Sequence, residues 1–154
     1  MSTTRTPAKR HLAPAERPGG TLVLDSQGLV AFADQNTTAR AAAEGVLARG
    51  GQIVIAATTL TEVLRGSARD TKIHRVLKTI TQEPITPQLA RQAGELLGRS
   101  GLDGHTHALD SLVAAVALAC PRPVLLLTSD VDDLTQLTEE PDKPKHARIA
   151  VHHV

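Results

Sequence analysis

Aromatic residues are almost absent from this 154-residue chain, which contains one phenylalanine, Phe32, and no tryptophan or tyrosine. The core must therefore be built from leucine, valine, isoleucine and alanine, and no aromatic platform is available on which nucleic-acid bases could stack. Cysteine is nearly absent too. Cys120 is the only one, so no intrachain disulfide can form, as is typical of proteins in a reducing cytoplasm.

Several other signals are missing from the sequence. No apolar run is long enough to span a bilayer, and the basic N-terminus lacks the apolar segment of a secretory signal. There is no P-loop, no dinucleotide fingerprint and no G-x-S-x-G nucleophile motif. The histidine pairs, at 105 and 107 and at 152 and 153, do not have the i, i+4 spacing of a helical zinc site. We therefore expect a cytoplasmic protein outside these classes.

Hydrophobic residues make up 41% of the chain and charged residues 21%, which is ordinary for one globular domain. The net charge of +1 hides an asymmetry, because the first twenty residues carry a net charge of +3 and the rest carries −2. The leader is also rich in Thr, Pro and Ala and has no hydrophobic period. We predict a disordered basic leader over residues 1–20 and a single folded domain over residues 21–154.

Strand-like and helix-like segments alternate along that domain. Short apolar runs predict buried strands at 21–24, 52–56 and 124–128, a brief strand or connector at 84–86, and an edge strand at 148–154. Amphipathic or apolar segments predict helices at 29–34, 37–49, 67–80, 87–100 and 105–120. This order predicts an α/β fold, a three-layer sandwich whose central, mostly parallel sheet has helices on both faces.

Carboxylates follow the ends of the predicted strands. Asp25 follows the first strand, Glu62 begins the helix after the second, and Asp130 follows the strand at 124–128, with Asp133 one turn further on. Two of these acids have a structural alternative: Asp25 can cap the next helix, and Glu62 fits a capping box with Thr59 as the N-cap. Right-handed crossovers would bring these strand ends to one edge of the sheet.

Asp110 is a fifth acid, placed near the start of an almost wholly apolar helix. An ionised carboxylate is costly there unless it is compensated. Three interpretations remain open: it uses the positive end of the helix dipole, it pairs with a buried arginine, or it is a metal ligand or catalytic acid.

The acids together favour a hard divalent cation. Four or five carboxylates in one pocket cannot all ionise without compensation. Oxygen ligands select Mg²⁺ or Mn²⁺ over zinc, and such sites serve phosphodiester hydrolysis.

The segments VLDSQGLV, TTLTEVLRG, HALDSLVAAVAL and LLLTSDVDDLTQL, taken together, resemble a PIN-domain ribonuclease of the kind found as VapC-like toxins in type II toxin–antitoxin systems. The resemblance runs from about residue 21 to the C-terminus. It implies a PIN-like fold, an RNA substrate, a cognate antitoxin, a homodimer and Mg²⁺ or Mn²⁺ as the cofactor. Gln27, where the family usually has a small residue, and the long leader depart from the pattern without removing an acid.

Residue by residue, the resemblance implies roles for the acids and for two serines. Asp25, Glu62, Asp110 and Asp130 match the family's catalytic and metal-binding acids, and Asp133 matches an additional acid of variable contribution. Ser26 and Ser129 match supporting hydroxyl positions.

RNA would have to be held by basic groups around an acidic pocket. The candidates are Arg65, Arg69, Lys72 and Arg75. The same basic row fits an ordinary solvated helix face. Two other functions also remain: a receiver-like Mg²⁺-binding signalling module, against which Asp110 within a helix counts, and a degenerate nuclease fold used only for protein interaction.

Overall fold

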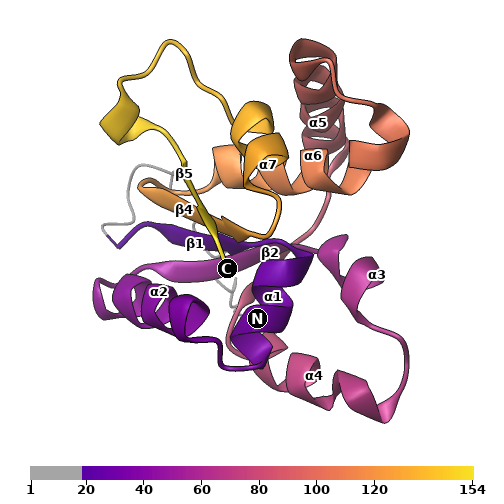
Figure 1. Ribbon diagram of the computed structural model, residues 1–154, viewed down its shortest axis with the longest axis vertical. Coiled ribbons are helices and arrows are strands. Elements are labelled where there is room, and N and C mark those ends of the chain that lie inside the picture. Colours follow the sequence, from indigo (N-terminus) through magenta and orange to yellow (C-terminus); the bar gives the residue numbers. More distant parts are fainter. Residues whose placement is uncertain (1–18) are drawn as a thin grey trace, which may run out of the picture.

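The computed structural model describes residues 19–154, and its centre is a five-stranded sheet in the order β3-β2-β1-β4-β5 (Figure 1). Every strand of this sheet runs parallel to its neighbours. The strands are β1 (Thr21–Leu24), β2 (Gln52–Ala56), β3 (Thr81–Glu83), β4 (Val124–Thr128) and β5 (Ala150–His153). The predicted parallel α/β architecture is confirmed. The predicted leader lies outside the described residues except for Gly19 and Gly20.

Helices cover both faces of the sheet (Figure 1). One face carries α1 (Ser26–Ala33), α2 (Thr37–Ala48), α3 (Thr59–Val63) and α4 (Thr71–Leu77). The other carries α5 (Pro87–Ser100), α6 (Gly104–Ala119) and α7 (Val131–Leu137). Short 3₁₀ turns lie at Ala68–Asp70 and Lys145–Ala147. None of the helices in residues 19–154 is both long and apolar enough to cross a membrane.

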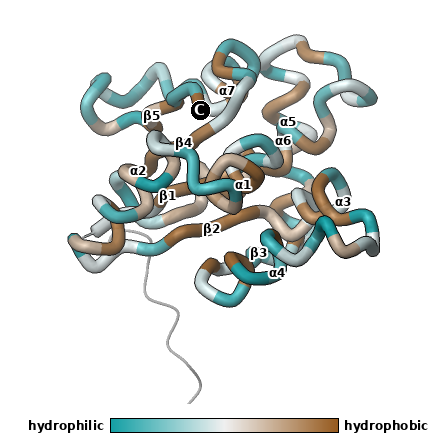
Figure 2. The backbone as a smooth tube through the Cα atoms, turned by 60° about the horizontal axis from the view of Figure 1, so that its bottom comes forward, coloured by the Kyte–Doolittle hydropathy of each residue, from teal (hydrophilic) through white to brown (hydrophobic). Residues whose placement is uncertain are grey.

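The central strands supply both layers of the core because successive side chains of a strand point to opposite faces. In β1, Leu22 and Leu24 pack towards α1 and α2, whereas Val23 packs towards α5 and α6. In β2, Ile53 belongs to the core layer on the α1 and α2 side, and Val54 belongs to the layer on the α5 and α6 side. Figure 2 shows β1 and β2 as hydrophobic segments inside a more polar outer layer. Strands buried on both faces explain why the sequence shows continuous apolar runs rather than alternation.

Two predicted elements are placed differently by the structure. The third strand is Thr81–Glu83 and not 84–86, because residues 81–83 pair with β2 in parallel register. The helix predicted over 67–80 is a 3₁₀ turn followed by α4, which ends at Leu77. At the start of this segment the Asp70 carboxylate accepts the backbone N–H groups of Arg65 and Gly66, so the chain turns there.

The other differences concern helix and strand ends. The first helix starts at Ser26 and not at 29, because Asp25 already caps it. The last strand is confirmed at the sheet edge but is limited to Ala150–His153. The helix at 87–100 has its predicted cap, since the Leu89 N–H donates to the Thr86 hydroxyl at 3.2 Å.

Candidate active site

Asp25 lies at the carboxyl end of β1, where its side chain has two roles. It is only 6% exposed and accepts a 2.7 Å hydrogen bond from the backbone N–H of Gly28, which caps α1. Burial raises the pKa of Asp25, while the hydroxyl of Thr128 and the N–H groups of Gly28 and Gln27 oppose that rise. The capping interpretation is therefore correct, and it leaves the carboxylate at the sheet edge beside the next acid.

The pairing of β1 with β4 places Asp130 near Asp25. These strands are in parallel register with Leu24 opposite Leu127, so Asp25 and Thr128 follow side by side. The fully buried Thr128 hydroxyl bonds to the Asp25 carboxylate and accepts the Asp130 N–H at 2.9 Å. Thr128 thus connects the two acids.

Asp110 projects from α6 into this group. Its pKa is raised to about 6, first because it is withdrawn from water and then because Asp130, Glu62 and Asp25 are negatively charged neighbours. The Asp110 carboxylate therefore lies within electrostatic reach of all three predicted partners. No salt bridge to an arginine is formed by Asp110 in the described part of the chain, which disfavours the buried-arginine interpretation.

Glu62 is an exposed residue in the first turn of α3, but its predicted capping box is absent. The N-cap of α3 is Thr58 and not Thr59, and no side chain caps the helix. The hydroxyls of Thr58 and Thr59 are both buried without a hydrogen-bond partner. Glu62 is therefore not needed to cap α3, and its carboxylate remains near Asp110.

Asp133 is paired with His107, which was not among the predicted site residues. Its Oδ2 lies 2.9 Å from Nε2 of His107, which projects from α6. One ligand atom each from His107, Asp110 and Asp133 lie within 4.8 Å of one another. The sequence contains no helical i, i+4 histidine pair, and the local signal for His107 was that Asp110 follows it by three residues.

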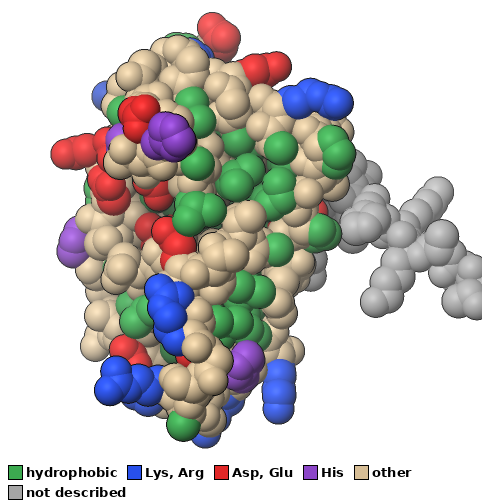
Figure 3. Space-filling view, turned by 90° about the vertical axis from the view of Figure 1, so that its right-hand side faces the viewer, with side chains coloured by type: hydrophobic (Ala, Val, Ile, Leu, Met, Phe, Trp, Pro, Cys, Tyr) green, Lys and Arg blue, Asp and Glu red, His purple; other side chains and the backbone are tan. Residues whose placement is uncertain are grey.

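Figure 3 looks onto the face at which the strands end and shows acidic side chains gathered near its middle, with histidine beside them. The donors are carboxylate oxygens with one imidazole nitrogen, a set that suits a divalent cation. Mutual repulsion of the acids would be relieved by such an ion. The residues present therefore fit a divalent metal. Ser26, half-buried at the start of α1, and the exposed Ser129 flank this acid group.

The four predicted basic residues lie on the segment from α3 to α4, and two of them already have partners. The Arg65 guanidinium donates to the carbonyls of Thr61, Glu62 and Leu64, and Lys72 pairs with Asp34 at 3.3 Å. The side chains of Arg69 and Arg75 form no hydrogen bond or ion pair within residues 19–154. Lys and Arg side chains lie below the acids in Figure 3, at the height of α3 and α4.

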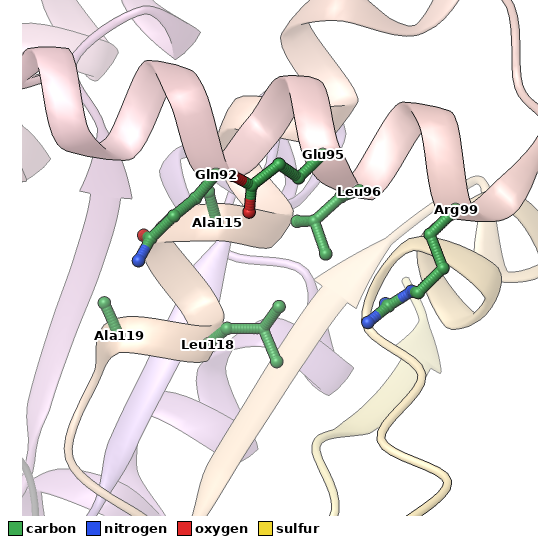
Figure 4. A pocket seen from close by; sticks show the side chains of 7 residues that line it. All are labelled: Gln92, Glu95, Leu96, Arg99, Ala115, Leu118 and Ala119. Carbon is green, nitrogen blue, oxygen red and sulfur yellow. The ribbon is translucent and has the colours of Figure 1, made fainter.

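Two surface pockets contain none of the predicted acids. One of about 470 Å³ has Val30, Val63 and Ile73 among its apolar walls and carries Arg65, Arg69 and Lys72. The other, of about 430 Å³, lies between α5 and α6 (Figure 4). It is lined by Gln92, Glu95, Leu96, Arg99, Ala115, Leu118 and Ala119. The first pocket is continuous with the predicted basic residues, and the second has none of the predicted site residues among those that line it.

Comparison with protein-family models gave no match, and comparison with curated proteins gave none. Among solved structures, the chain is similar to a chain in the crystal structure of VapBC2 from Rickettsia felis bound to a DNA fragment from its promoter. The match has a TM-score of 0.63 and 17% identity, and it covers 87% of this chain and 98% of the VapBC2 chain. At this identity the likeness establishes the fold, and it confirms the PIN-like fold implied by the sequence resemblance.

Proposed function

From the fold that this chain shares with VapBC2, we propose that the protein is a divalent-metal-dependent endoribonuclease, the toxin of a toxin–antitoxin pair. The observation that carries the proposal is the environment of Asp110, whose pKa is raised to about 6 by burial and by Asp130, Glu62 and Asp25. The four acids come from four separate elements and lie together at the carboxyl ends of the strands. The fold itself does not require acidic residues there.

In this proposal Asp25, Glu62, Asp110 and Asp130 hold Mg²⁺ or Mn²⁺, with Asp133 beside them. When bound, the ion polarises the scissile phosphate and lowers the pKa of a bound water. Thr128 orients Asp25, and the N–H of Gly28 fixes the same carboxylate from the other side. The protein therefore presents preorganised carboxylate oxygens that would hold the ion beside the scissile phosphate.

RNA is held outside the acidic centre. Arg69 and Arg75 are the stronger contacts for phosphate in this proposal, because Arg65 and Lys72 are already engaged. Each phosphate contact that is lost should weaken binding to all sequences and lower its salt dependence. Arg69→Gln and Arg75→Gln should therefore weaken RNA binding, whereas Arg91→Gln on the outer helix α5 should not.

The proposal also includes a homodimer, a cognate antitoxin and a cytoplasmic location. The VapBC2 structure supports the antitoxin, since it is a complex bound to promoter DNA. Light scattering on the purified protein gives the oligomeric state. Co-purification with the product of a neighbouring gene, with loss of cleavage in the complex, would identify an antitoxin.

The decisive experiment is cleavage of total RNA by the purified protein with Mg²⁺, with Mn²⁺ or with EDTA. Asp110→Asn should abolish cleavage, and Asp132→Asn should not, because Asp132 faces another groove on α7 that includes Thr135 and Arg148. Undiminished cleavage by Asp110→Asn would contradict the proposal. If wild type cleaves nothing and binds no Mn²⁺ by calorimetry, the fold serves interaction alone.

A further inference from the structure

His107 occupies an unusual position in α6. The backbone leaves helical geometry at this residue, with φ −112° and ψ 15°, so the first turn of α6 is set off from the rest. That first turn is capped separately by Asp103, whose carboxylate accepts the Thr106 N–H at 2.9 Å. The kink therefore gives His107 a placement that a continuous helix would not provide.

The orientation of the His107 ring is fixed through one nitrogen. Nδ1 lies 3.2 Å from the backbone carbonyl oxygen of Asp103. A carbonyl only accepts, so Nδ1 carries the proton and donates it. With Nδ1 donating to the carbonyl, Nε2 bonds to the Asp133 carboxylate by donating a proton of its own, and loss of that proton would leave the Nε2 lone pair free for a metal ion.

This is the arrangement of a metal-binding histidine, whose second nitrogen typically donates to a backbone carbonyl or carboxylate. The side chains of His107 and Asp133 are 18% and 29% exposed, which leaves access for an ion. Nε2 and Asp133 Oδ2 lie 2.9 Å apart, close enough that both atoms would bind one ion.

Asp110 completes the group from the same helix. Asp110 follows the kink at His107 by three residues and lies in the regular part of α6. The ligand atoms of His107, Asp110 and Asp133 lie within 4.8 Å of one another. Small side-chain movements would let all three bind one ion.

We propose that Nε2 of His107 is a direct ligand of the divalent cation, together with Asp110 and Asp133, and that it makes the site prefer Mn²⁺ to Mg²⁺. Mg²⁺ is a hard ion that selects oxygen, whereas imidazole nitrogen favours first-row transition ions. The inference rests on the proposed function, because it concerns the metal of the same acid site. The competing role for His107 is an ion pair that only orients Asp133.

Electron spin echo modulation of bound Mn²⁺ separates these roles, because only a directly coordinated imidazole gives strong ¹⁴N modulation. The measurement uses the full-length protein with Mn²⁺ alone, in wild type, His107→Gln and Asp110→Asn. His105→Gln is the matched control, since His105 is an exposed histidine two residues away on the same helix. Circular dichroism confirms that each variant is folded.

We expect ¹⁴N modulation in wild type and His105→Gln and its loss in His107→Gln. In calorimetry, His107→Gln should weaken Mn²⁺ binding at least about tenfold and change Mg²⁺ binding much less. Mn²⁺ binding that depends on Asp110 but shows no ¹⁴N modulation would overturn the role of His107 and leave the acid site intact. Absence of Mn²⁺ binding in the folded wild type would overturn the metal centre and this inference with it.

Discussion

The Asp25 carboxylate accepts a 2.7 Å hydrogen bond from the Gly28 backbone N–H, so one side chain both caps α1 and faces the acids of the site. The two residues are held close to β4: a Cβ on Gly28 would stand 2.6 Å from the Leu127 carbonyl oxygen. The Asp25 carboxylate therefore both caps α1 and serves as a proposed metal ligand. Different substitutions at Asp25 can separate these two roles.

Asp25→Asn should abolish RNA cleavage with little loss of stability, because asparagine caps helices as well as aspartate does. Asp25→Ala should also abolish cleavage and in addition lower the free energy of unfolding by about 1 kcal/mol. Urea denaturation of the metal-free proteins measures the difference. Equal stability of the alanine and asparagine variants would show that the cap contributes nothing.

Thr128→Val should weaken both the fold and metal binding. The substitution keeps the shape but removes the hydroxyl that bonds to Asp25 and accepts the Asp130 N–H, at a cost of about 1–3 kcal/mol in unfolding free energy. Thr21→Val is the control, because it removes a similarly buried hydroxyl bonded to Pro121 at 2.9 Å, at the opposite end of β1. Both variants should unfold more easily, and only Thr128→Val should bind Mn²⁺ more weakly in calorimetry.

Much of this architecture could be predicted because the signals are local. The runs at Thr21–Leu24 and Val124–Thr128 are apolar enough to be strands without tertiary information, and the Thr86–Pro87 pair marks a helix start. The gathering of the acids followed from topology, since parallel strands bring their ends to one edge. Asp25 and Asp130 could therefore be placed before the structure was known.

The features that were missed depend on partners distant in the sequence. The strand Thr81–Glu83 has no apolar pattern and exists through its pairing with β2. Thr59 has the sequence of a cap, but the chain enters α3 one residue earlier, and local sequence does not encode that choice. His107 meets Asp133 across 26 residues and at a helix kink, so spacing alone did not reveal the contact.

Asp110→Asn should stabilise the metal-free protein above pH 6. The pKa of Asp110 is raised from 3.8 to about 6, so the folded state holds a proton that the unfolded state loses as pH rises between these values, and stability falls across that window. The shift corresponds to at most about 3 kcal/mol, and partial exposure leaves about 1–2 kcal/mol. Thermal unfolding at pH 7.5 with EDTA should show a higher Tm for Asp110→Asn. A lower Tm would mean that the carboxylate stabilises the fold.

Mn²⁺ affinity should rise with pH through pH 6, because an ion binds the ionised form of Asp110 and releases its proton. Burial lowers the pKa of His107, but its hydrogen bonds to Asp133 and the Asp103 carbonyl outweigh that effect and raise the pKa, so coordination by His107 should extend the rise above pH 6. Below pH 6 the affinity should fall about tenfold for each pH unit if one proton is released. Calorimetry in buffers of different ionisation enthalpy measures the released proton directly. A flat profile between pH 5 and 7 would contradict the raised pKa.

Glu140→Gln should destabilise the loop before β5. Both carboxylate oxygens of Glu140 accept hydrogen bonds from Arg122, at 2.7 and 2.8 Å. Burial alone would raise the Glu140 pKa, but Arg122 and Lys143 outweigh it and lower the pKa. The stabilisation is therefore present above pH 4.5 and is lost as the pH falls through the lowered value.

The expected cost of Glu140→Gln is about 2 kcal/mol in unfolding free energy at pH 7, as for hydrogen bonds to charged groups, and less at pH 3. Glu139→Gln, at the exposed neighbouring position, should have little effect. The same cost for Glu140→Gln at pH 3 and pH 7 would rule out an ionic contribution.

The β1–β4 pairing also sets when the site can first exist during synthesis. Asp25 is made first of the proposed acids, but its supporting hydroxyl on Thr128 and the neighbouring acid Asp130 come more than a hundred residues later. A chain still emerging from the ribosome thus carries an incomplete set of acids until Asp130 has been made. The acid cluster can close only after that point, when all the strands and helices between Asp25 and Asp130 are available to fold around it.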